Sequence, residues 1–345
     1  MRKSFLLVAV FIAMAINVGA QNESVIEDGG SGPYKAVMTS DASLTTHTIF
    51  RPKDISKFGK GNLLPILLWG NGGCAKSCSG HVNFLNDVAS QGFFIVAIGP
   101  MPAPREAARP GQTGGGMPQG GGAPAGGRMP QMGGGMPQMG GGAPAGGRMP
   151  QMGGGMPQGG GAPAGGGMSM GDPADLKIAL EWVIAQNADK TSPYYGKLDI
   201  ENIAAAGMSC GGLEAIRMSD DARIKTIMVM NSGLFNDGTD KGLLAQMKQK
   251  SVIWILGGPS DIAYENGMDD FKRMSGSMPA FICSLDGIGH GGTYMQPFGG
   301  DYSKVAGAWL KWWLKNDKEA GMMFTGDECG LSKFENWTVD RKNIK

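Results

Sequence analysis

The apolar positions of the chain follow two patterns, one typical of strands and one typical of helices, and the two take turns along the sequence. Two short alternating segments at 34–38 and 44–50 predict antiparallel strands at the start. Further segments, most of them continuous apolar runs, predict strands at residues 64–69, 93–98, 198–203, 224–230, 252–256 and 280–284. Helical patterns lie between these strands at 81–91, from Asp172-Pro173 to 184, at 243–247 and around Phe271, with Asp172 as N-cap and Pro173 in the first turn. This alternation predicts an α/β fold with a mostly parallel sheet covered by helices on both faces.

The segment 110–171 differs from this pattern. It is dominated by glycine, contains no acidic residue and repeats a unit of alanine, proline, glycine, methionine and glutamine. Such a composition buries too little apolar surface to offset the entropy of ordering, so a disordered insertion is expected. Two interpretations stay open: a flexible insertion in one loop, or an adaptable contact in which the methionines, Arg128 and Arg148 meet an apolar or acidic surface.

The first 20 residues have the pattern of a signal peptide. Arg2 and Lys3 precede an apolar run at 5–16, and small residues at 18–20 offer a cleavage site near Ala20. Twelve apolar residues are too few to span a bilayer, for which about 18 to 20 are needed. The protein is therefore expected to be secreted or periplasmic, with residues 21–345 forming one domain interrupted by the insertion. The formal net charge of +1 predicts neither a nucleic-acid nor a membrane partner.

The chain holds five cysteines, at positions 74, 78, 210, 283 and 329. In an oxidising compartment one or two disulfides are expected, with at least one thiol left over. The spacing of Cys74 and Cys78 does not match a zinc or redox C-x-x-C motif, and the chain has three histidines. We therefore predict no metal site and no cofactor.

Residues 207–211, Gly-Met-Ser-Cys-Gly, follow an apolar run and precede a helical pattern. This arrangement is typical of a nucleophile elbow, in which glycines allow a sharp turn from strand to helix and the serine projects from the sheet. Ser209 is the candidate nucleophile, and the backbone N–H of Cys210 is placed to stabilise an oxyanion. The alternative is a glycine-rich turn with a structural serine.

A second glycine-rich loop, residues 70–74, leaves the predicted strand at 64–69. In a serine hydrolase with this elbow, the second oxyanion donor comes from that loop, and Asn71 is the candidate. The alternative is an ordinary glycine turn. If both donors serve one oxygen, Cys74 and Cys210 come close, and they can form a disulfide if their Cα atoms lie within about 7 Å. Pairings through the other three cysteines, or a buried free thiol, stay open.

The elbow serine needs an imidazole to accept its proton and a carboxylate to orient that imidazole. Asp261 and His290 each follow a predicted strand, and the order Ser209, Asp261, His290 is the order expected of an α/β-hydrolase. A turn-capping role for Asp261 and a solvated loop position for His290 are the structural alternatives, and Asp286 is a competing acid. For His47 and His81 we favour structural roles.

Several motifs together resemble the secreted α/β-hydrolases grouped with dienelactone-hydrolase-like proteins and with polyesterase, lipase and cutinase enzymes. The resemblance covers about residues 32–345 apart from the insertion, and its motifs are 32–34, 48–52, 69–74, 89–92, 207–212, Asp261, 289–294, 308–312, 329–331 and Trp337. It implies ester hydrolysis through Ser209, Asp261 and His290, with main-chain oxyanion donors at Asn71 and Cys210. Asn71 stands where the polyesterases carry an aromatic residue, and the insertion is absent from their pattern. Dienelactone hydrolases proper use a cysteine nucleophile, whereas the elbow here carries Ser209.

We therefore expect an exported serine carboxylesterase that works through an acyl-enzyme. Small acyl or aryl esters, including esters on polysaccharides, are the expected substrates, because no apolar lid helix is evident. The alternative is a catalytically silent hydrolase fold that serves in binding or surface display. The sequence does not determine the oligomeric state.

Overall fold

The computed structural model describes residues 22–103, 171–236, 240–274 and 276–345. The expected signal peptide and nearly all of the expected insertion lie outside these ranges. The described residues belong to one compact unit built on a ten-stranded sheet in the order β1-β2-β3-β5-β4-β6-β7-β8-β9-β10. The strands are β1 (Glu23–Ser24), β2 (Ala36–Thr39), β3 (His47–Pro52), β4 (Leu64–Gly70), β5 (Phe94–Ile98), β6 (Leu198–Met208), β7 (Ile224–Met230), β8 (Ser251–Leu256), β9 (Ala280–Leu285) and β10 (Trp337–Lys342).

The central strands β5, β4, β6, β7, β8 and β9 run parallel to one another. The strands at the two sides, β1, β2 and β3 at one and β10 at the other, pair antiparallel. The predicted α/β class and mostly parallel sheet are therefore confirmed, as is the antiparallel start.

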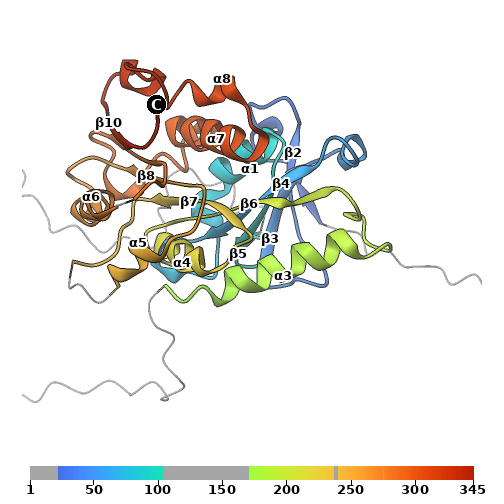
Figure 1. Cartoon of the computed structure of the whole chain (residues 1–345). Coiled ribbons are helices and arrows are strands. Elements are labelled where there is room, and N and C mark those ends of the chain that lie inside the picture. The colour runs from blue at the N-terminus through green and yellow to red at the C-terminus, as the bar shows by residue number, and fades with distance from the viewer. Residues whose placement is uncertain (1–21, 104–170, 237–239, 275) are drawn as a thin grey trace, which may run out of the picture. The chain divides into compact units, whose positions relative to one another are not determined.

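Helices cover both faces of the sheet, as Figure 1 shows. Helices α1 (Val82–Ser90), α7 (Gly300–Lys315) and α8 (Lys318–Gly321) lie on one side of it, and α3 (Ala174–Ala188), α4 (Cys210–Arg217) and α5 (Gly242–Gln246) lie on the other. Helix α6 (Tyr264–Arg273) packs near β8 and β9. None of the helices in the described ranges has both the length and the apolar character required to cross a bilayer.

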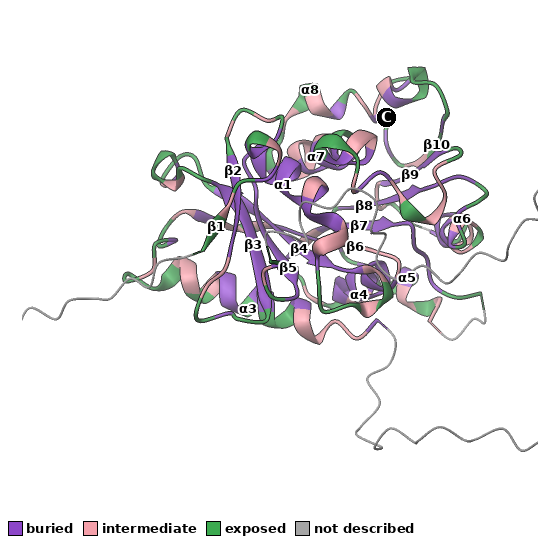
Figure 2. Ribbon diagram, turned by 180° about the vertical axis from the view of Figure 1, so that it is seen from behind, coloured by how far each residue is buried: buried purple, intermediate pink, exposed green. Residues whose placement is uncertain are grey.

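The core consists of two apolar clusters, one on each face of the sheet. Successive residues of a strand point to opposite faces, so β4 contributes Leu67 and Trp69 to the cluster under α1 and α7, and Ile66 and Leu68 to the cluster above α3 and α4. Every residue of β4 is buried, which is why the strand is continuously apolar in sequence. Figure 2 shows the same burial along the central strands.

Most predicted elements lie within a few residues of the observed ones, and three differences stand out. Helix α3 begins at Ala174 with Pro173 as its N-cap, so Asp172 is not the cap, although its Oδ1 still accepts the N–H of Ala174 at 3.0 Å. Strand β10 was not predicted, because only its first residue is buried and its pattern is polar. Helix α7 was also not predicted as an element.

Candidate active site

The elbow lies at the tight junction between β6 and α4. Ser209 has φ 53° and ψ −117°, a conformation that is strained for any residue other than glycine. A Cβ at Gly207 would collide with the main chain of Gly211, and a Cβ at Gly211 would collide with the main chain of Gly70. Glycine is therefore required at both ends of the motif, as the sequence predicted, and this close packing holds the strained serine in place.

Ser209, His290 and Asp261 form a continuous hydrogen-bonded chain. The Oγ of Ser209 lies 3.0 Å from Nε2 of His290, and Nδ1 of His290 lies 2.6 Å from Oδ1 of Asp261. With the imidazole proton on Nδ1, His290 donates to Asp261 and accepts from the serine hydroxyl. Ser209 follows β6, Asp261 follows β8 and His290 follows β9. The carboxyl ends of these parallel strands lie at one edge of the sheet. The structure thus brings together the three residues singled out from the sequence.

Asp261 is held as a buried carboxylate by several donors. Its Oδ1 accepts the N–H of Ala263 at 2.9 Å, and its Oδ2 accepts the N–H of Gly257 at 3.1 Å and Nδ2 of Asn231 at 2.8 Å. Burial by itself raises the pKa of Asp261, but the hydrogen bonds from His290 and these donors outweigh it and hold the pKa below its usual value. Asp261 is therefore ionised at neutral pH and able to stabilise a charged imidazole.

Asn231 is a site residue that the sequence reasoning missed. It is fully buried with φ 42°, and its Nδ2 reaches Asp261, the carbonyl oxygen of Gly289 at 3.2 Å and the hydroxyl of Tyr302 at 3.2 Å. Its Oδ1 accepts the hydroxyl of Tyr294 at 2.7 Å. Asn231 therefore links the acid to the loop that carries His290. The available signal was its position directly after the predicted strand at 224–230, where polar residues of an α/β sheet gather around a site.

The loop after β4 faces the elbow through its main chain. Asn71 is extended, with φ −94° and ψ 157°, and its carbonyl oxygen accepts the N–H of Gly211 at 3.0 Å. In an extended residue the N–H points to the same side as the C=O, so the N–H of Asn71 faces the elbow as well. The Asn71 side chain fixes the loop, because Nδ2 donates to the carbonyl oxygens of Ala75 and Ile98 and Oδ1 accepts Nε1 of Trp69.

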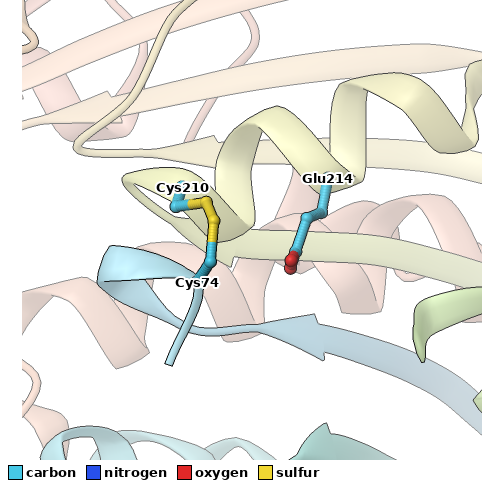
Figure 3. A group of neighbouring side chains, drawn as sticks. All are labelled: Cys74, Cys210 and Glu214. Atoms are coloured by element: carbon cyan, nitrogen blue, oxygen red, sulfur yellow. A yellow bond between two sulfur atoms is a disulfide. The ribbon is translucent and has the colours of Figure 1, made fainter. Parts of the chain in front are cut away.

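A disulfide between Cys74 and Cys210 ties this loop to the first residue of α4. Their Cα atoms are 5.2 Å apart, and Figure 3 shows the bridge beside Glu214. The pairing raised as one alternative from the sequence is therefore present, and Cys78, Cys283 and Cys329 are buried free thiols. A carboxylate oxygen of Glu214 lies within 4.8 Å of both sulfurs, an arrangement that could hold a metal ion. With the sulfurs joined to each other, however, the site offers no thiolate to a metal.

The remaining candidates lie elsewhere. Asp286 is exposed, and its carboxylate is not the partner of His290 Nδ1. His81 is buried against the rings of Trp69 and Tyr294, and burial lowers its pKa to about 4, so it is neutral at pH 7. His47 is buried in β3, where Nε2 lies 3.1 Å from the carbonyl oxygen of Asp175.

Comparison of the chain with models of protein families and with curated proteins gave no match, so neither assigns it to a family.

Proposed function

We propose that the protein is a serine carboxylic-ester hydrolase of the α/β-hydrolase class. The observation that carries this proposal is the hydrogen-bonded chain from Ser209 through His290 to the ionised, buried Asp261. Such a chain lets a serine hydroxyl lose its proton at the moment it attacks a carbonyl carbon. The strand-turn-helix setting of Gly207–Gly211 supports the same class, because it is the context that a nucleophile elbow requires.

In the first half of the reaction, Oγ of Ser209 attacks the ester carbonyl while Nε2 of His290 takes the hydroxyl proton. The charge on the imidazole is stabilised by Asp261, and the proton then passes to the leaving alcohol. In the second half, His290 deprotonates a water molecule that attacks the acyl-enzyme, and the proton returns to Ser209 as the acid product leaves. Each bond to Ser209 that forms in one half is broken in the other.

The negative oxygen of each tetrahedral intermediate is assigned to two main-chain donors, the N–H groups of Asn71 and Cys210. Cys210 is the first residue of α4, so its N–H has no partner within the helix, and the helix N-terminus favours negative charge. The Asn71 side chain is occupied by other bonds, which leaves its main chain for this task. One such donor typically contributes about 10²- to 10³-fold in rate.

Small acyl or aryl esters, free or attached to polysaccharide, are the substrates that we propose. Met208 is half-buried beside the nucleophile, and Ile262, directly after Asp261, is 81% exposed. Both provide apolar contact area close to the triad, which suits an apolar acyl or aryl group. We further propose that the enzyme acts outside the cytoplasm, as the N-terminal segment indicates.

Labelling with a fluorophosphonate probe tests the proposal directly. The probe should modify Ser209 in the folded protein, and the Ser209→Ala variant should remain unlabelled. The protein should also hydrolyse a p-nitrophenyl ester of a short acid. A folded protein that takes up no label and hydrolyses no ester would instead favour the silent binding or display function.

A further inference from the structure

The disulfide beside the nucleophile has an unusual neighbour. Cys210 and Glu214 stand one helical turn apart on the same side of α4, and Cys74 approaches them from the loop after β4, as Figure 3 shows. A carboxylate oxygen of Glu214 lies within 4.8 Å of both sulfurs. Cys74 is half-buried, whereas Cys210 and Glu214 are 5% and 3% exposed. Solvent therefore reaches the disulfide from the side of Cys74, and the carboxylate of Glu214 lies on the buried side of the disulfide.

Glu214 is not accounted for by the ester hydrolysis described above. Its Oε2 is buried and has no hydrogen-bond partner among the residues that the structure describes. The carboxylate packs against Gly70, where a Cβ would collide with Oε2, so glycine at position 70 makes room for it. A buried carboxylate with an unpaired oxygen is costly, and such groups concentrate at functional sites.

The charges around Glu214 come from three parts of the chain. Burial raises its pKa to about 7; Lys76 and Arg217 oppose this rise, and Asp172 and Asp175 add to it. Lys76 lies in the loop that carries Cys74, the two aspartates lie at the start of α3, and Arg217 ends α4. Glu214 can therefore give up or take a proton close to neutral pH.

We propose that Cys74, Cys210 and Glu214 form a thiol–disulfide exchange site, whose reductant is a dithiol that attacks Sγ of Cys74 while Glu214 protonates the leaving sulfur of Cys210. The leaving role falls to Cys210 because its sulfur is the buried one and is attached to the same helix as the acid. Exposure selects Cys74 as the atom attacked.

The exchange balances in two steps. A thiolate of the reductant bonds to Sγ of Cys74, the bond to Cys210 breaks with its electron pair on Sγ of Cys210, and that sulfur takes the proton of Glu214. The second thiolate of the reductant then attacks the reductant's other sulfur, which is bonded to Cys74 in the mixed disulfide. This step releases Sγ of Cys74, which takes a proton from solvent. The reductant leaves as a cyclic disulfide, the protein gains two thiols, and solvent returns a proton to Glu214.

Reduction also changes the hydrolase site, and this part of the inference rests on the proposed function. The bridge joins the loop of Asn71 to Cys210, so it fixes the two oxyanion donors relative to each other. Cys74 is held at φ 51°, a left-handed conformation unfavourable for a residue with a Cβ. Once the bridge is cut, the loop relaxes and the donor is displaced. The exchange site thus switches off ester hydrolysis in reducing surroundings.

The first experiment measures reduction of the full-length protein by dithiothreitol between about pH 6 and pH 8.5. Alkylation followed by mass spectrometry reports Cys74 and Cys210 separately from the three buried thiols. At pH 6 the wild type should be reduced about 10- to 100-fold faster than Glu214→Gln, and the ratio should fall toward one as Glu214 ionises. Dithiothreitol is ionised to the same extent with both proteins at a given pH, so its ionisation does not affect the ratio of the two reduction rates. Glu319→Gln, on the exposed surface of α8, is the matched control and should follow the wild type.

Equal rates for wild type and Glu214→Gln at pH 6 would overturn the role of Glu214. If that variant does not fold, the wild-type rate per reductant thiolate decides: it should decline as pH rises through about 7, and a flat profile overturns the proposal. A bridge that resists reduction in the folded protein also overturns it.

The second experiment follows hydrolysis of a p-nitrophenyl ester and fluorophosphonate labelling before reduction, after it and after reoxidation with oxidised glutathione. Activity should fall about 10²-fold on reduction, as for one lost oxyanion donor, and should return on reoxidation. Full activity in the reduced protein overturns the switch. If the oxidised protein neither hydrolyses ester nor takes label, the proposed function fails, while the reduction rates still decide the exchange site.

Discussion

Replacing Asn231 by leucine tests whether the buried amide positions the catalytic acid. Leucine fills a similar volume but donates no hydrogen bond, so Asp261 would lose the 2.8 Å contact to its Oδ2 and keep its donors Ala263, Gly257 and His290. The nucleophile and the oxyanion loop are left unchanged, but the contact of Asn231 with the carbonyl oxygen of Gly289, in the loop that carries His290, is lost as well. The substitution therefore tests the support of Asp261 and of this loop without altering the three proposed catalytic side chains.

The size of the effect follows from the kind of hydrogen bond that is lost. A hydrogen bond to a charged acceptor contributes about 1.5 to 3 kcal/mol, and a tenfold change in rate corresponds to about 1.4 kcal/mol. We expect kcat to fall roughly 10- to 100-fold, with KM nearly unchanged, because Asn231 is fully buried and has no surface to offer a substrate. Stability should fall by about 2 to 5 kcal/mol, since the hydroxyl of Tyr294 loses its acceptor as well.

The assay is steady-state hydrolysis of a p-nitrophenyl ester, with urea unfolding to measure stability. Asn86→Leu is the matched control: Asn86 lies on α1, is 1% exposed and donates a 2.9 Å hydrogen bond to the carbonyl oxygen of Ile26 rather than to a residue of the triad. It should lose stability but keep kcat. If Asn231→Leu also loses only stability, the positioning role is refuted.

The Asn231→Asp variant adds a pH readout that a purely structural role would not produce. It places a second carboxyl group beside Asp261 at the position of the 2.8 Å contact, and two carboxylates so close share one proton. At low pH the shared proton restores the hydrogen bond. As pH rises and that proton leaves, the two charges repel, so the activity of the variant relative to wild type should decline. A constant ratio across the pH range would contradict this reasoning.

Four further predictions concern other parts of the protein. Ser209→Ala should fold normally and lower kcat by about 10⁴-fold or more; an active variant would place the nucleophile elsewhere. Asp261→Asn should impair ester hydrolysis far more than Asp286→Asn, and the reverse order in kcat would reject the assigned acid. Deletion of 110–171 should leave the melting temperature and aryl-ester hydrolysis unchanged, and loss of either would show that the segment is needed. Because the folded pKa of Glu214 is raised to about 7, the stability that its neutral form provides is lost as pH rises from about 4.5 through 7. Urea unfolding should therefore show Glu214→Gln gaining about 1 to 3 kcal/mol relative to wild type between pH 5 and 8.

The sequence predicted the central part of the fold because its strands are buried on both faces and are therefore continuously apolar. The predicted strand at 224–230 coincides with β7 (Ile224–Met230), whereas β10 (Trp337–Lys342) lies at an edge and has a polar pattern that does not indicate a strand. Ser209, Asp261 and His290 could be proposed because each residue type has a specific chemical task and each follows a predicted strand.

Other parts of the site could not be predicted from the sequence. The position of Asn231 directly after a predicted strand was a weak signal, because asparagine is common there and the position does not reveal its partners. Its role depends on contacts with residues up to 71 positions away. Glu214 lies in a helix where glutamate is a normal surface residue, and only the approach of Gly70 and Cys74 makes it a buried neighbour of the disulfide. The Cys74–Cys210 pairing was one of several alternatives, since proximity in space decides it.

The network around Asn231 also bears on when during its production the protein can become active. Its partners extend to Tyr302, the third residue of α7, so a chain that is still being made lacks part of the network until that helix has been synthesised. Ser209 and its elbow are complete almost a hundred residues earlier, yet Asp261, His290 and Tyr302 follow in turn. The proposed nucleophile therefore exists in the growing chain well before it could be activated. Under the proposed function, ester hydrolysis can begin only after α7 has been made, and its appearance would report that the C-terminal part of the domain has folded.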